Sequence, residues 1–188
     1  MSEDKRVRRT KKLLRQALAE LMQEKEFKNI TVTDVVRRAD INRGTFYTYY
    51  QDVFDLREKV ENEMVDTLRA LVDRSLLGGE TGTMRSVLEQ AVKYLEENRA
   101  LTYALLSDRS LGSFEDKLMT LMEACSQKIL PPKNRGDLVP IWFAAAGCIG
   151  VIKKWMIQDE AISKDAAIAQ IDAILCGILH MAGARPGL

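Results

Sequence analysis

A short stretch around residue 43 carries the side chains with the most specific chemistry in this 188-residue chain. Arg43 has a guanidinium that can donate two hydrogen bonds to the O6 and N7 atoms of guanine. Thr45 can reach a base edge or a thymine methyl, and Gly44 between them allows the backbone to approach closely. These residue types in this order predict a surface that reads bases in the major groove of DNA.

Neighbouring residues could hold that surface on the DNA backbone. Tyr47 and Tyr49 offer hydroxyls to phosphate groups, and Thr48 falls near the same side of the expected helix. Seven basic residues with no acid between them run from Lys5 to Arg15. They could add salt-sensitive affinity for phosphates, and we assign this role to Lys5, Arg6, Arg8 and Arg9. The alternative is a solvated, frayed arm, because basic tails are common.

These groups need two helices and a tight turn to position them. Thr31 precedes a helix over residues 32–39, and Asp34 three residues later forms a near capping box. Asp40 then tolerates the left-handed backbone that a tight turn often needs. Asn42 is a good N-cap for the next helix and joins the predicted DNA-binding residues. On that helix Phe46 and Tyr50 share the inward face, which leaves Arg43 outward, as in a helix-turn-helix.

The rest of the chain also predicts helices, so the expected fold class is all-α. Apolar residues from Leu13 to Met22 repeat every three to four positions and indicate a first helix. A long helix is expected from Asp52 to about Leu77, followed by helices near 84–98, 100–108, 113–130, 137–158 and 163–183. The stretches GGETGT (78–83) and PPKNRG (131–136) are expected to separate helices.

Composition excludes several classes of protein. The 28 basic and 27 acidic residues nearly balance, and the longest uncharged run, residues 138–152, is shorter than the ~20 residues that a membrane span needs. The three cysteines show no CxxC pair, which favours reduced core thiols in the cytoplasm over a disulfide framework or a zinc site. The lone His180 lies in an apolar segment, and no catalytic or cofactor motif appears, so we expect neither an enzyme nor a cofactor.

The segment from Arg9 to Leu56 resembles the DNA-binding domain of the TetR/AcrR family of transcriptional regulators. The matching pieces are LLRQALAELM, FKNITVTDVVRRADINRGTFYTYY and FDL. The resemblance implies that Thr33 touches phosphate or base, and that Tyr47 binds a phosphate. Two positions depart from the family pattern: Val53 stands where many members have a lysine, and Glu26 replaces a frequent glycine.

The resemblance also implies a division of labour, with a three-helix DNA-binding domain at residues 1–57 and an effector-binding and dimerisation domain at residues 58–188. The last two helices are apolar around much of their circumference, so they must be buried on most sides. In the family such helices pair in a homodimer, which would bind a palindromic operator in double-stranded DNA. An ordinary core hairpin in a monomer is the alternative.

The resemblance further implies an unidentified small-molecule effector, bound among the middle helices. Seven residues could line its pocket, although each could also be plain core: Tyr94, Tyr103, Met119, Met122, Trp142, Phe143 and Met156. The leading interpretation is a homodimeric, ligand-responsive regulator, more often a repressor in this family. The alternatives are an activator without a small-molecule effector and a helical protein-interaction module.

Overall fold

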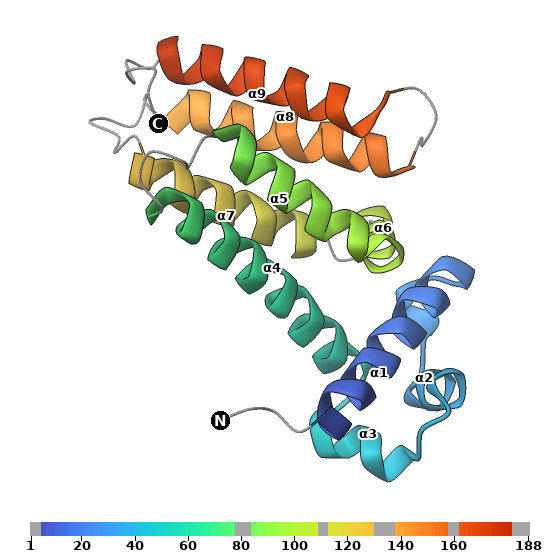
Figure 1. Cartoon of the computed structure of the whole chain (residues 1–188). Helices are drawn as coiled ribbons and strands as arrows, with labels where there is room; N and C mark the ends of the chain where they lie inside the picture. Colours follow the sequence, from blue (N-terminus) through green and yellow to red (C-terminus); the bar gives the residue numbers. More distant parts are fainter. Residues whose placement is uncertain (1–4, 78–83, 109–112, 130–137, 158–161, 182–188) are drawn as a thin grey trace. The chain divides into compact units, whose positions relative to one another are not determined.

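The computed structural model describes residues 5–77, 84–108, 113–129, 138–157 and 162–181, and these residues form helices with no strand among them (Figure 1). The chain divides into two compact units, Met1–Met64 with Asn98–Gly112, and Val65–Glu97 with Ser113–Leu188. In chain order the helices are α1 (Lys5–Glu24), the short 3-10 helix η1 (Phe27–Asn29), α2 (Val32–Ala39), α3 (Arg43–Tyr49), α4 (Val53–Leu77), α5 (Met84–Glu97), α6 (Arg99–Ser107), α7 (Ser113–Ile129), α8 (Leu138–Ile157) and α9 (Lys164–Met181). The predicted all-α class is confirmed, while the expected separators at 78–83 and 131–136 lie outside the described residues.

The first unit is organised by the apolar stripe of α1. Leu14, Ala17, Leu18 and Leu21 are buried, as their three-to-four spacing predicts. The helix begins well before this stripe, at Lys5, so the basic run is helical rather than a frayed arm. Helix α1 packs against both α2 and α6, and α2 packs against α3.

The unit that holds the first helices extends beyond the predicted boundary at residue 57. That boundary falls inside α4, which runs unbroken from Val53 to Leu77. The compact unit continues to Met64 and also takes in α6, which comes from much later in the chain. The reason is packing: α6 buries Leu101, Ala104 and Leu105, and α1 is the helix it packs against.

A buried cluster of charges helps to hold α4 and α6 in this unit. The Arg57 side chain is 3% exposed; its Nε donates to Glu61 at 2.7 Å and its Nη1 donates to Asp108, just after α6. The guanidinium also lies over the Phe27 ring, 4.6 Å from the centroid. Burying a charge is costly unless it is paired and hydrogen-bonded, so these partners are what make Arg57 tolerable in the core.

The second unit has its own apolar core, formed where α5, α8 and α9 meet. Its buried residues are Leu88, Val92, Cys148, Ile168, Ile171 and Leu175. Helices α7 and α8 also pack together, and Lys153 of α8 pairs with Glu115 of α7. Lys164 of α9 pairs with Glu96 of α5 at 3.0 Å, which adds a surface link across the same core.

Helix α8 agrees with the predicted helix at 137–158, and it extends beyond the uncharged run 138–152 through Lys153 and Lys154. Among the described residues, Leu138–Met156 is the one helix long and apolar enough to cross a membrane, with a mean hydropathy of 1.4. A single helix of this kind is weak evidence for a membrane protein, since core helices of soluble proteins have the same length and composition.

The cysteines are free thiols, and two of them match the expected core positions. Cys125 and Cys148 are buried, and burial raises the pKa of the Cys148 thiol to about 11. Cys176 differs, because it is exposed on α9 and lies in the same helix as an exposed apolar side chain, Ile174. The prediction of a core thiol is therefore wrong for Cys176.

The buried charge cluster makes a testable prediction about stability. Asp108→Ala should lower the free energy of unfolding by about 3 kcal/mol, because it removes a partner from a buried guanidinium. The matched control is Asp73→Ala, which removes a carboxylate from the exposed pair with Lys128 and should cost less than about 1 kcal/mol. Urea denaturation followed by circular dichroism measures both, and equal losses would contradict a structural role for the cluster.

Candidate nucleic-acid interface

Hydrogen bonds close both ends of α2, and the capping box at its start was predicted from the sequence. Thr31 Oγ1 accepts from the Asp34 backbone N–H at 3.2 Å, and the Thr31 N–H donates to Asp34 Oδ2 at 2.9 Å, which completes a capping box. At the other end Asp40 adopts a left-handed backbone with φ of 52°, the expected conformation. The Ile41 N–H then donates to the Val36 carbonyl at 3.0 Å, which closes the end of α2.

The N-terminus of α3 is capped by Asn42, as predicted. Asn42 Oδ1 accepts from the Gly44 N–H at 2.7 Å, so one of the unsatisfied donors of the first turn is paired. A Cβ atom at Gly44 would lie 3.2 Å from the same Asn42 oxygen, a tight contact. Glycine at this position therefore avoids crowding the capping oxygen of Asn42. It also leaves the exposed backbone uncovered, so that another molecule can approach it closely.

Phe46 of α3 and Tyr50 directly after the helix are buried, while the remaining side chains of α3 are exposed or half-buried. Phe46 is completely buried and its ring lies 5.7 Å from that of Tyr50, which is also buried. Arg43 and Tyr47 of the same helix are exposed. Arg43 Nη2 donates to the Tyr47 hydroxyl at 3.1 Å, and its guanidinium carbon lies 5.6 Å from the Tyr47 ring centroid. The two groups predicted to contact DNA thus lie together on one exposed surface.

The other predicted residues occupy a range of environments. Thr33, Asn42, Gly44 and Thr48 are exposed, whereas Thr45 and Tyr49 are half-buried. The Thr48 hydroxyl donates to the Gly44 carbonyl at 3.1 Å, one turn back along α3. Most of this set is therefore exposed to solvent, and the two half-buried members are partly accessible.

The basic residues Lys5, Arg6, Arg8 and Arg9 are exposed on the first turns of α1. Positive charge at a helix N-terminus opposes the helix dipole, so these residues do not stabilise α1. Their position favours a role in binding an anion over a role in folding.

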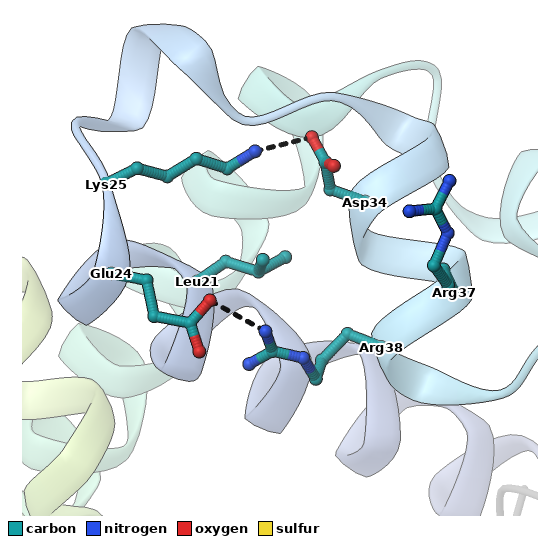
Figure 2. A pocket seen from close by; sticks show the side chains of 6 residues that line it. All are labelled: Leu21, Glu24, Lys25, Asp34, Arg37 and Arg38. Carbon is teal, nitrogen blue, oxygen red and sulfur yellow. Dashed lines mark hydrogen bonds and ion pairs between the residues drawn. The ribbon is translucent and has the colours of Figure 1, made fainter.

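A polar hollow of about 490 Å³ lies between the end of α1 and α2 (Figure 2). Its charges largely pair with one another: Lys25 donates to Asp34 at 2.7 Å, and Arg38 donates to Glu24 at 2.7 Å. Arg38 also reaches Glu20 at 3.2 Å. These pairs hold α2 against α1, and they thereby help to position the helix-turn-helix.

Comparisons with known proteins agree with this geometry. Residues 14–56 match the family of bacterial regulatory proteins described as tetR, and residues 82–177 match a transcriptional regulator C-terminal region. The chain belongs to the TetR family of transcriptional regulators. The second match alone covers half of the chain.

Individual relatives of this TetR-family chain are distant. It is 21% identical to an uncharacterized HTH-type regulator of Bacillus subtilis (strain 168), YxbF, over 81% of this chain and 41% of YxbF. It is 31% identical to DhaS, the dhaKLM operon transcriptional activator of Lactococcus lactis subsp. lactis (strain IL1403), over 48% of this chain and 45% of DhaS. The matches thus span less than half the length of these curated relatives.

A solved structure has a similar fold. A crystal structure of a TetR-family regulator from Syntrophomonas wolfei str. Goettingen superposes with a TM-score of 0.69 at 18% identity, covering 93% of this chain and 95% of that one. At this identity the likeness is evidence for the fold alone, and the N-terminal helix-turn-helix with a helical C-terminal region is confirmed.

The two departures from the TetR pattern have structural explanations. Val53 is buried at the start of α4, so it packs inside the unit and offers no cation to a phosphate. Glu26 precedes η1 with φ of −57°, which any residue adopts, so this turn needs no glycine.

Lys59 helps to position α3, and this role was not predicted from the sequence. Lys59 on α4 donates to the Tyr49 carbonyl at 3.1 Å and to Asp55 Oδ2 at 2.9 Å. It therefore ties the last turn of α3 to the first turn of α4. The spacing of four between Asp55 and Lys59 is visible in the sequence, but the contact of Lys59 with the backbone of α3 is not.

The residues predicted to line an effector pocket lie in different settings. Tyr94, Met119 and Met122 are half-buried in the second unit, and Met156 is buried there. Tyr103 is half-buried on α6, in the first unit. Trp142 and Phe143 are 45% and 71% exposed on α8, so they face away from the core of the second unit, and the side chain of His180 lies outside the described residues.

The capping box predicts a pH dependence of stability. Hydrogen bonds from Lys25 and Thr31 hold the pKa of Asp34 well below its usual range. A depressed pKa stabilises the fold above the unfolded value of ~3.9, and this stability is lost as the pH falls through the folded value. Asp34→Asn should therefore cost about 1 kcal/mol at neutral pH, and the gap to wild type should narrow from about pH 5 to about pH 2.

Urea denaturation at a series of pH values measures this gap, with Asp66→Asn as the control at an exposed aspartate. A gap of constant size across the series would show that the charge of Asp34 does not contribute to the stability of α2.

Proposed function

We propose that this protein is a homodimeric DNA-binding transcriptional regulator whose affinity for a palindromic operator is controlled by a small-molecule effector. One observation carries the DNA-binding part: Arg43 is exposed on the first turn of α3, while Phe46 of the same helix is buried. Arginine at this place in a recognition helix can bind guanine O6 and N7 in the major groove. Chromosomal DNA as the partner implies a cytoplasmic protein.

The proposed contacts divide into two kinds. Arg43 and Thr45 read base edges, with Gly44 keeping the surface low. The exposed hydroxyl of Tyr47, the cations of α1 and Thr33 contact phosphates, which supply affinity without sequence preference. Asn42 acts through its cap, because it fixes the first turn of α3 that carries Arg43.

The homodimer forms through α8 and α9. Large apolar side chains on these helices are exposed in the single chain, among them Phe143 and Ile174, and a second subunit would cover them. A two-fold axis would present two recognition helices about 34 Å apart, one turn of the duplex. A palindromic operator follows from the same symmetry.

The effector acts from residues 58–188, while residues 1–57 carry the DNA contacts. A compound can shift the regulator only by its difference in affinity between the DNA-bound and the released states. Repression is the first candidate for the outcome, with release of DNA when the effector binds. Activation is the second candidate, favoured by the likeness to DhaS, which is named as an operon activator.

Two substitutions separate base reading from phosphate binding. Arg43→Ala should cost about 1–3 kcal/mol on the selected operator and relax the preference at one base pair. Arg8→Ala should weaken binding to all sequences alike and reduce the slope of log K against log salt by about 1. Fluorescence anisotropy on matched and mismatched duplexes over a salt series measures both, and identical profiles for the two variants would refute base reading by Arg43.

The effector is tested on the sequence that the protein selects. Rounds of binding to random duplexes should yield a palindrome with two half-sites, and a compound library is then screened for release or tightening of that duplex. A compound that shifts the DNA affinity by tenfold or more supports the effector, while an operator affinity that no compound changes favours a regulator without one.

A further inference from the structure

Helix α8 carries a continuous exposed face that we call the outer stripe. Its members recur every three or four positions: Val139, Trp142, Phe143, Ala146, Gly147, Gly150, Val151 and Lys154. The opposite side of α8 is buried and includes Ile141, Ala145, Cys148 and Met156. The core of the second unit therefore accounts for one side of α8, and the outer stripe needs a separate explanation.

Within the part of the subunit that the structure describes, nothing packs closely against the glycines of the outer stripe. A Cβ atom added at Gly147 or Gly150 would meet no atom within 4 Å, and the same holds for Gly177 on α9. Glycine inside a helix costs about 1 kcal/mol relative to alanine. Since none of the described residues requires glycine at these positions, we attribute them to a close approach from a second molecule.

An apolar hollow of about 620 Å³ lies at these glycines. Gly147, Gly150 and Val151 of α8 line it from one side, and Ile171 and Ile174 of α9 line it from the other. The outer stripe also offers two large side chains that could enter such a hollow, since Phe143 is 71% exposed and Trp142 is 45% exposed. The bulky residues lie in the first half of α8 and the hollow lies along its second half.

We propose that the outer stripe pairs antiparallel with its copy in a second subunit, with the two-fold axis between Ala146 and Gly147. In this register Phe143 lies opposite Gly150 of the partner subunit, and Trp142 lies opposite Val151 of the partner subunit. Phe143 of each subunit then fills the hollow of the other. This inference rests on the proposed homodimer and adds its register and its anchor residue.

The pattern of sizes selects this register over others. It sets each bulky residue of the stripe against a small or medium one, and it sets Ala146 against Gly147 at the axis. A parallel pairing would instead place Phe143 against Phe143 and leave the glycines facing one another across a void, which close-packed interfaces avoid. Val139 lies opposite Lys154, whose aliphatic stem can cover it while the ammonium reaches water.

The size of the face is sufficient for a dimer. A 20-residue helix is about 30 Å long and two adjacent helices are about 20 Å wide, so α8 and α9 offer about 600 Å² per subunit. That area is at the lower end for specific interfaces. Aromatic side chains that fill a pocket near the centre of such a face are its typical binding hot spots.

The test moves the aromatic ring from position 143 to position 150. Phe143→Ala should weaken dimerisation of the full chain at least about 30-fold, because it removes the anchor. Gly150→Phe should weaken it by a similar factor, because the new ring occupies the hollow. The double variant Phe143→Ala with Gly150→Phe places the ring on the other side of the same contact, and it should recover dimerisation to within about tenfold of wild type.

Sedimentation equilibrium gives the dissociation constants, and circular dichroism confirms that each variant is folded. Neither position supports the subunit core, since Phe143 is largely exposed and Gly150 faces open space. Phe54→Ala is the control, because Phe54 is a similarly exposed aromatic residue in the first unit and should leave dimerisation unchanged.

The outcomes separate this inference from the proposed function. A wild-type chain that stays monomeric at micromolar concentrations overturns both. A wild-type dimer that Phe143→Ala does not weaken overturns the anchor and leaves the homodimer in place. A double variant weaker than either single variant overturns the register.

Discussion

The orientation of the DNA-facing surface depends on the burial of Phe46. Helix α3 has seven residues, fewer than two full turns, and a helix this short is not stable by itself in water. It exists because Phe46 packs into the first unit, while Asn42 caps one end and Lys59 holds the other. The burial of Phe46 fixes the rotation of α3 about its axis, and Arg43, in the first turn of the helix, stays exposed together with Tyr47. The contact that stabilises α3 therefore also decides which of its side chains remain exposed.

A second constraint operates in the core behind this surface. Arg57 is buried among apolar residues, and its charge is balanced by Glu61 one turn along α4 and by Asp108, which lies 51 residues later in the chain. The ring of Phe27 covers the guanidinium. A distant carboxylate thus becomes part of the unit that contains the helix-turn-helix. Together with the packing of α6 on α1, it explains why this unit does not end where the sequence resemblance ends.

The two units differ in how completely they bury their apolar residues. In the first unit the apolar faces of α1, α2 and α3 close on one another, and most outward residues are polar or charged, with Phe54 as an exposed aromatic exception. In the second unit α8 and α9 bury one side in a shared core and leave the other side apolar and exposed. A surface of this kind is uncommon on a soluble monomer and is typical of an interface. The family assignment and the exposed apolar surface therefore both favour the proposed homodimer, and they do so independently of each other.

Local rules in the sequence were enough to predict the helices, the capping box at Thr31, the left-handed Asp40, the cap at Asn42 and the outward side of α3. Each of these depends on residues within one or two turns of each other, so their spacing carries the information. Only the tertiary structure decided that α6 joins the first unit, that Asp108 reaches Arg57, and that Trp142 and Phe143 face outward from α8. Both faces of α8 are apolar, so hydrophobic periodicity could not distinguish the core from the outer stripe; the packing of α5, α7 and α9 made that choice.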